Sequence, residues 1–462
     1  MGTIFLHQLH DHLKSLRFQI SLLVLLLFFV VNGLVFAWRA ERLAIEMTHL
    51  SQENERRYEE VETVAQAAGN WYRFTSQQLG TEFMAEGGAR FLRTTFWVSP
   101  ETGTVPSSDI PMTVNAIMER YDLVDWTLIV RLVLSFLCIV LAYDAVSREL
   151  ELGTLRILLA NPVSRAQFLA GKFLAHLVVL LVSVVIGSLV SLLLLSLSGA
   201  FELSQHILQG YGLFLVGVAL YISLFLFVAM GVSALTRNSS SSIVLLVLVW
   251  AVFIVIVPQV SSIIAEQTVE TPKPWQHWEF IGEVREGLEK EGVVLRGREE
   301  GRADNYAQER RYAQRLREAE KEQAQIARNV DELMRRQYRV AKAVNLVSPG
   351  YAFQYTVEGF LGAGVVRRDL AIKLAWQYRD TLRDFFRARD AADPDSPHMA
   401  FFGEYMSEKA LDPANIPRLE LRRPSLTEGL AAEVAPIVVL VLEVALAFFF
   451  AVWALNRTDI AG

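Results

Sequence analysis

Six long apolar stretches constrain the fold of this chain more than any other feature. A helix needs roughly 17–25 mostly apolar residues to cross a hydrocarbon core of about 30 Å. The stretches that meet this requirement are 18–38, 126–143, 173–197, 211–235, 243–265 and 436–455. Hydrophobic residues make up 52% of the chain and charged residues 20%, against about 45–50% and about 25% in soluble domains. The sequence therefore predicts an all-α membrane protein with six transmembrane helices.

The composition also excludes several classes of protein. Cys138 is the only cysteine, which excludes disulfide scaffolds and cysteine-based metal sites. A net charge of −6 gives no general basic field, so no nucleic-acid partner is expected. Val35-Phe36-Ala37 loosely matches a signal-peptide cleavage site. The apolar core of 18–38 is too long for a signal peptide and the chain starts at Met1, which favours a retained anchor.

Basic residues in the short links indicate how the chain crosses the membrane. The short segments that carry them are 1–17, 144–172, 236–242 and 456–462. The link 198–210 has no Lys or Arg. Since short basic segments stay in the cytoplasm, both termini are expected there, with six crossings between them. Arg39 and Arg42 lie on the opposite side, but they open a long segment, and long segments translocate largely regardless of charge.

Two polar segments, 39–125 and 266–432, are then expected outside, as a large periplasmic region of a multi-pass inner (plasma) membrane protein. We expect them to be mostly helical, with stalks that rise from the membrane. In the second segment, apolar residues recur with a 4-3 spacing typical of a coiled coil. They are Tyr312, Leu316, Ala319, Ile326, Val330, Leu333, Val340 and Val344. Gln323 and Gln337 interrupt the pattern, so an amphipathic helix packed on its own domain is an equally good interpretation.

The link 144–172 is the most informative polar segment. Ser147 to Glu151 form a charged extension of the second apolar stretch, and Gly153 allows a turn. Thr154 can cap a short helix with an apolar face, which Asn161-Pro162 ends. Such a helix lying across the cytoplasmic face is a good docking element for a soluble partner.

This link resembles the signature of the permease subunits of type-2 ATP-binding cassette (ABC) exporters. The signature combines an acidic pair, Gly-Thr-Leu, two leucines, a Pro-Val-Ser-Arg turn and Gly-Lys. The matching positions are Glu149, Glu151, Gly153, Thr154, Leu155, Leu158, Leu159, Pro162, Val163, Ser164, Arg165, Gly171 and Lys172. Arg156, within the same short helix, joins them as an ATPase-coupling candidate. Asn345-Leu346-Val347-Ser348-Pro349 resembles the subfamily with enlarged extracytoplasmic segments.

The resemblance implies a permease that is driven by a separate ATPase. Gly359-Phe360-Leu361-Gly362-Ala363-Gly364 lacks the lysine of a P-loop, so this chain is expected to be non-catalytic and to hold no cofactor. ATP and Mg would bind the partner ATPase, expected in two copies. A second permease chain, identical or related, and the lipid bilayer complete the expected partners, with a periplasmic protein as a further candidate.

Residues 1–17 are amphipathic and are expected to lie in the membrane interface as an elbow helix beside the ATPase. His7, His10 and His12 lie on this segment. A metal cluster is the less favoured interpretation of them, because no carboxylate or cysteine set completes a site.

Charges within the apolar stretches are costly and are candidates for functional residues. Arg131 lies about 9 Å inward from Asp125, and Glu443 about 10 Å inward from Pro436, at 1.5 Å per residue. We hypothesise an ion pair between them near an outer gate. The alternative is that Arg131 extends outward to the membrane surface and Glu443 faces a dimer cavity. Pro258 should kink or end the fifth helix, as a gate hinge would require.

Three functions follow from these features. The first is an ABC exporter permease. The second is mechanotransmission, in which ATPase-driven motion of the outer stalks acts on a periplasmic partner without transport. A sensory receptor ranks last, because the inner segments are too short for an output domain, and no outer His has the context of a catalytic residue.

Overall fold

The computed structural model describes residues 2–75, 80–86, 95–101, 124–160, 163–199, 204–236, 238–270 and 306–458, with four single positions between 283 and 290. Of the residues singled out above, Asn161 and Pro162 lie outside these ranges, and only the backbone is described at Arg156, Leu159, Ala319, Gln323 and Val330.

Six helices of the described chain are long and apolar enough to cross a membrane, which confirms the predicted number. Four are continuous: α2 (Leu16–Glu59), α8 (Arg165–Leu197), α9 (Gln205–Leu235) and α17 (Val434–Arg457). The second span contains α4 (Trp126–Leu128), the π-helical turn η1 (Ile129–Leu134), α5 (Ser135–Ala142) and α6 (Ser147–Glu151). The fifth contains α10 (Ser239–Trp250), the π-helical turn η2 (Ala251–Ile256) and α11 (Val257–Thr268).

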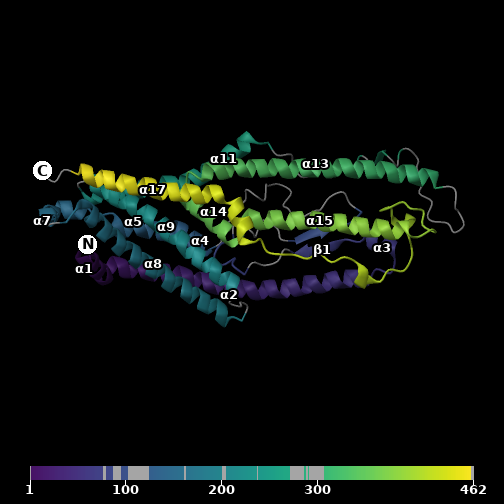
Figure 1. Ribbon diagram of the computed structural model, residues 1–462, viewed down its shortest axis with the longest axis horizontal. Coiled ribbons are helices and arrows are strands. Elements are labelled where there is room, and N and C mark those ends of the chain that lie inside the picture. The colour runs from purple at the N-terminus through teal and green to yellow at the C-terminus, as the bar shows by residue number, and fades with distance from the viewer. Residues whose placement is uncertain are drawn as a thin grey trace.

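The molecule is elongated, with the apolar helices gathered at one end (Figure 1). Both chain termini and α7 (Thr154–Ala160) lie at the far end of this bundle, which we call the link end. From the opposite end, the stalk end, project α2, α13 (Ala307–Asn345) and α15 (Gly364–Ala391). With 44 residues, α2 is about 66 Å long at 1.5 Å per residue, so one helix runs from the bundle into the polar domain.

The polar segments fold together around a core of their own. Its short elements are α3 (Val64–Gly69), β1 (Tyr72–Thr75), β2 (Thr95–Val98), η3 (Gly403–Tyr405) and η4 (Pro413–Asn415). The strands pair antiparallel, with Tyr72 opposite Val98, and are a small departure from the predicted all-α fold. The hydroxyls of Tyr58 and Tyr378 lie 2.7 Å apart in this core, and Arg418 covers the Tyr58 ring. Tyr58 belongs to the first polar segment and Tyr378 to the second, so the two segments form one unit.

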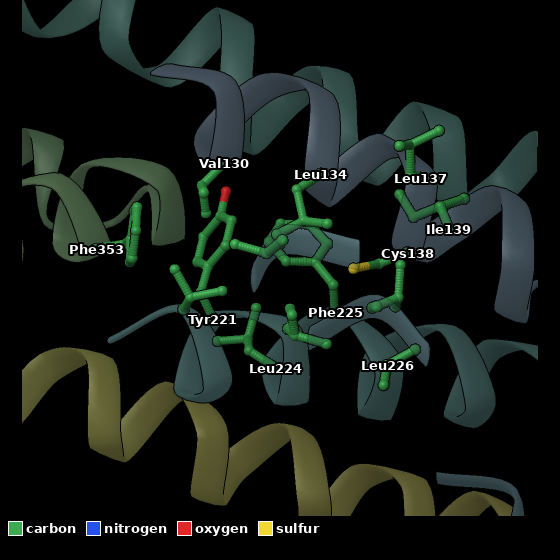
Figure 2. Close-up of a cluster of buried hydrophobic side chains, with 14 of the residues drawn as sticks. Val130, Leu134, Leu137, Cys138, Ile139, Tyr221, Leu224, Phe225, Leu226 and Phe353 are labelled. Atoms are coloured by element: carbon green, nitrogen blue, oxygen red, sulfur yellow. The ribbon is translucent and has the colours of Figure 1, made fainter. Parts of the chain in front are cut away.

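Side chains of the second and fourth spans pack against each other in the bundle core. Figure 2 shows Val130, Leu134 and Cys138 facing Tyr221 and Phe225, with the Phe353 ring of α14 (Pro349–Leu361) beside Tyr221. The Tyr221 and Phe353 rings stack with their centroids 4.8 Å apart. A helix from the polar segment 266–432 therefore contributes to the core of the apolar bundle.

Asn32, fully buried on α2, is a polar centre of this bundle. Its amide nitrogen donates to the carbonyls of Phe83 and Val124, at 3.2 and 2.7 Å. Its amide oxygen accepts from the Trp126 indole and the Ser191 hydroxyl, each at 2.9 Å. All four hydrogen-bonding positions of the amide are therefore used. They join the first, second and third spans to the loop 80–86.

We predict that Asn32→Leu strongly destabilises the protein. The apolar side chain removes the donor to the Val124 carbonyl and the acceptor of the Ser191 hydroxyl, and each orphan costs about 1–3 kcal/mol. We expect a loss on the order of 2–4 kcal/mol, measured by thermal unfolding in detergent. Ser183→Ala is the control, because the partner of the Ser183 hydroxyl among the described residues is a carbonyl of its own helix, that of Val179. Equal melting temperatures for the Asn32 and Ser183 variants would refute the role of Asn32.

Candidate functional site

The link 144–172 forms a helical hairpin at the link end of the bundle. The charged helix α6 ends at a turn where Gly153 adopts φ +69°, a conformation that favours glycine. No described atom lies within 4 Å of the position a Cβ would take at Gly153, so backbone conformation, and not space, requires the glycine. The short helix α7 follows. The turn predicted at Gly153 is therefore present.

Glu149 fixes the hairpin to the third span. Its carboxylate accepts a 2.9 Å hydrogen bond from the Lys172 ammonium on α8, and a second one from the Thr154 hydroxyl. The Thr154 hydroxyl also lies 3.3 Å from the Glu149 carbonyl oxygen. Lys172 is buried, so this pair is shielded from the solvent that weakens exposed ion pairs. Three residues from the sequence signature therefore meet in one contact.

Glu151 and Ser147 fix the hairpin to the fourth and fifth spans. The Glu151 carboxylate accepts a 2.6 Å hydrogen bond from the backbone N–H of Ser239, the first residue of α10. A negative charge at a helix N-terminus is favourable, because the helix dipole is positive there. The backbone N–H of Ser147 donates to the Ser233 hydroxyl at 2.9 Å, and the hydroxyls of Ser147 and Ser239 lie 3.0 Å apart. Sequence reasoning missed both Ser233 and Ser239.

Arg165 fixes the end of the link to the sixth span. Its guanidinium donates to the carbonyls of Leu455 and Asn456, at 2.6 and 2.9 Å. These carbonyls belong to the last turn of α17, where a cation complements the negative end of the helix dipole. Ser164 caps α8 through a reciprocal pair of hydrogen bonds with Gln167. The link is therefore bonded to the third, fifth and sixth spans by Glu149, Glu151 and Arg165, which we call the three anchors.

The hairpin leaves apolar side chains uncovered. Leu155 is 1% exposed and packs into the bundle, and Leu158 is half-buried. By contrast, Leu152 and Ile157 are 66% and 69% exposed. We call Leu152 and Ile157 the exposed link pair. An apolar pair held on a firmly anchored hairpin can bind a partner without first being ordered.

The N-terminal helix α1 (Gly2–Lys14) packs beside the third span. The His12 ring meets the His176 ring edge-on, with centroids 4.2 Å apart. Burial, together with His176 and Lys172, lowers the pKa of His12 to about 3, so His12 is neutral at pH 7. His7 is exposed and lies 3.5 Å from Asp11. The described residues contain no group of three or more His, Cys, Asp or Glu side chains suited to a metal.

Among the contacts described, Arg131 is bonded to α14 and not to Glu443, its hypothesised partner. Arg131 donates to the amide oxygen of Gln354 at 2.8 Å and lies over the Tyr351 ring. Glu443 Oε2 is buried with no hydrogen-bond partner among the described residues. The physical reason is α14, which packs against both α17 and η1 and presents its own polar side chain to Arg131.

Just before Pro258, the fifth span changes its pattern of helical hydrogen bonds. Val257 N–H donates to the carbonyl of Val252, five residues back, at the end of the turn η2. Proline lacks an N–H and crowds the carbonyl four residues earlier, here that of Ile254. This π-helical turn ends two residues before Pro258, close to the place where the sequence predicts a kink or an end of the regular helix.

Comparison with known proteins places these features in a family. Residues 3–460 match the family described as ABC-2 family transporter protein. The chain is also similar to the probable ABC transporter permease protein NosY of Stutzerimonas stutzeri, with 33% identity over 124 residues, covering 27% of this chain and 45% of the relative. NosY of Pseudomonas aeruginosa is 31% identical over 141 residues, covering 30% of this chain and 48% of the relative. The matches thus span about half the length of these relatives. Because the family match covers nearly the whole chain, the protein belongs to the ABC-2 family of transporter proteins.

Proposed function

We propose that this chain is the transmembrane permease subunit of an ABC transporter, and that a separate ATPase subunit docks on the link 144–172. One observation carries the proposal: the exposed link pair lies on a hairpin that Glu149 and Glu151 bind to the third and fifth spans, and Arg165, at the start of the third span, bonds that span to the sixth. A push on the hairpin therefore acts on three membrane helices at once.

The anchors suit this role because each combines a charge with a hydrogen bond. Charge-assisted hydrogen bonds are roughly twice as strong as neutral ones, and here they cross between helices. Glu151 and Arg165 contact helix termini, so a movement of the link is passed along the axes of α10 and α17. In this proposal two ATPase copies, with ATP and Mg, serve two permease chains that are identical or related.

The orientation follows from the same assignment. The link end faces the cytoplasm, where the ATPase binds, and the stalk end faces the periplasm from the inner membrane. Export of a cargo is the primary proposal, because the signature of the link resembles that of exporters.

Mechanotransmission is the second candidate, and the unbroken helix α2 favours it. Because α2 joins the apolar bundle to the polar domain without a break, a movement of its end in the bundle also moves its end in the polar domain. The ion pair of Arg39 with Glu86, which forms two hydrogen bonds of 2.6 and 2.7 Å, stiffens the place where α2 leaves the bundle.

We predict that Ile157→Asp, alone or with Leu152→Asp, reduces both co-purification of the ATPase and its stimulation at least about tenfold. A carboxylate in a desolvated contact costs more than the roughly 1.4 kcal/mol that a tenfold change requires. Val347→Asp is the matched control, because Val347 is an exposed aliphatic residue (54%) next to α14, toward the stalk end. If the Ile157 and Val347 variants bind and stimulate the ATPase equally, the docking assignment is wrong.

We predict that Arg165→Gln lowers the stimulation of the ATPase while the ATPase still binds the permease. The ATPase should still co-purify, because the exposed link pair is intact, but its stimulation should fall at least about threefold as the contact with α17 is lost. Arg165→Lys, which keeps the charge at the helix terminus, should retain more stimulation than Arg165→Gln. Arg310→Gln is the control, because Arg310 is an exposed residue of α13. Full stimulation in Arg165→Gln would exclude the sixth span from the coupling route.

A further inference from the structure

The helix α14 joins the polar domain to the apolar bundle. It belongs to the polar segment 266–432, yet most of its residues are buried, and it contacts α9, α17, η1 and η2. Through residues 346–348 it follows α13, and through Gly362, at φ +63°, it leads toward α15. Any movement of α14 is therefore passed to both of these stalk helices.

Two spans change their hydrogen bonding where they meet α14. In η1 the Ser135 N–H donates to the Val130 carbonyl, five residues back, and in η2 Val257 does the same to Val252. Such π-helical turns are rare and mostly occur as single turns at functional sites. Here both turns contact one helix.

Gly350 and Arg131 form the contact. A Cβ at Gly350 would lie 2.7 Å from Arg131 Cγ and 3.1 Å from Ile254 Cδ1, so Gly350 fits between the two π turns. The guanidinium carbon of Arg131 lies 4.4 Å from the centre of the Tyr351 ring. Gln354 accepts from Arg131 and donates to Glu358 at 2.8 Å. We call Arg131, Ile254, Gly350, Tyr351 and Gln354 the α14 clasp.

The π turn of the second span is held by side chains. The Arg131 carbonyl accepts hydrogen bonds from the Ser135 hydroxyl, at 2.6 Å, and from the Tyr221 hydroxyl, at 3.0 Å. The Trp250 indole of the fifth span donates to the same Ser135 hydroxyl at 2.8 Å. Since a π turn withdraws carbonyls from the α-helical pattern, these donors stabilise the π form over the α form.

We propose that the α14 clasp is a releasable joint between the membrane helices and the stalks. Conversion of η1 to α-helix changes the hydrogen-bond register by one residue. This rotates the adjoining helix by about 100° and shifts it along its axis by about 1.5 Å. That rotation carries Arg131 away from Gln354 and Tyr351 and frees α14 to move with α13 and α15. The proposal rests on the proposed function, which supplies the driving force, and it adds a two-state element at the stalk end.

Tyr221→Phe tests the clasp with the smallest change, because it removes one of the two hydroxyls that donate to the Arg131 carbonyl of the π turn. The reporter is Ser348→Cys in a Cys138→Ala background. Ser348 is fully buried, precedes α14 and lies outside the clasp. Labelling of this cysteine by a membrane-impermeant maleimide is measured on the permease alone in lipid nanodiscs. Tyr211→Phe is the matched control, because Tyr211 lies on the same helix and its hydroxyl is 2.9 Å from Ser188, away from η1.

We expect Tyr221→Phe to increase the labelling rate at least about threefold and Tyr211→Phe to leave it unchanged. Gly350→Ala, whose added methyl displaces Arg131, should also increase the rate. Equal rates in the Tyr221 and Tyr211 variants, with no increase in Gly350→Ala, would overturn the proposal.

A second arm adds the ATPase and traps it with nucleotide and vanadate. The clasp predicts that trapping changes the labelling rate in the otherwise native chain. If the ATPase binds and is stimulated while the rate stays constant, the clasp is wrong and the proposed function stands. If the ATPase does not bind, the proposed function fails, and the comparison of Tyr221 with Tyr211 still decides whether the clasp exists.

Discussion

The need to pair polar groups inside an apolar bundle is the constraint on which this structure depends. In hydrocarbon an unpaired polar group costs several kcal/mol, so a partner within the protein stabilises a polar side chain there. Asn32 meets this requirement with four hydrogen bonds that fix three spans and the loop 80–86 together. Arg131 meets it by binding α14. The same rule thus holds the bundle together and attaches the polar domain to it.

These pairings divide the molecule into a sequence of rigid parts and joints. The hairpin of the link is bonded to the third and fifth spans by Glu149 and Glu151, and Arg165 bonds the third span to the sixth. The spans in turn hold α14, and α14 connects α13 with α15. At the base of the stalk, Lys342 of α13 pairs with the buried Glu433 that precedes α17. Continuous contacts therefore run from the exposed link pair to the stalk helices, which is what either export or mechanotransmission requires.

The sequence predicted the parts of the fold that depend on local pattern. Six apolar helices, the turn at Gly153 and the interruption near Pro258 follow from apolar length, glycine conformation and the missing proline N–H. The position of α14 does not, because 13 residues are too few for a span and the helix lies in a polar segment. Arg131 seemed to need a carboxylate, and Glu443 had the right depth, but an amide 223 positions away is its partner. Likewise the Ser233 hydroxyl accepts from backbone N–H groups, and the backbone N–H of Ser239 donates to Glu151, which spacing alone cannot reveal.

If movement produced at the link reaches the stalks, the distance between two stalk helices must change with the state of the ATPase. Spin labels at Ser51 on α2 and Gln314 on α13, both exposed, report that distance in a Cys138→Ala background. The measurement is pulsed electron resonance on the permease with its ATPase in nanodiscs, without nucleotide and after trapping with vanadate. We expect trapping to shift the distance distribution. Identical distributions in the two states, with ATP hydrolysis stimulated by the permease, would contradict it.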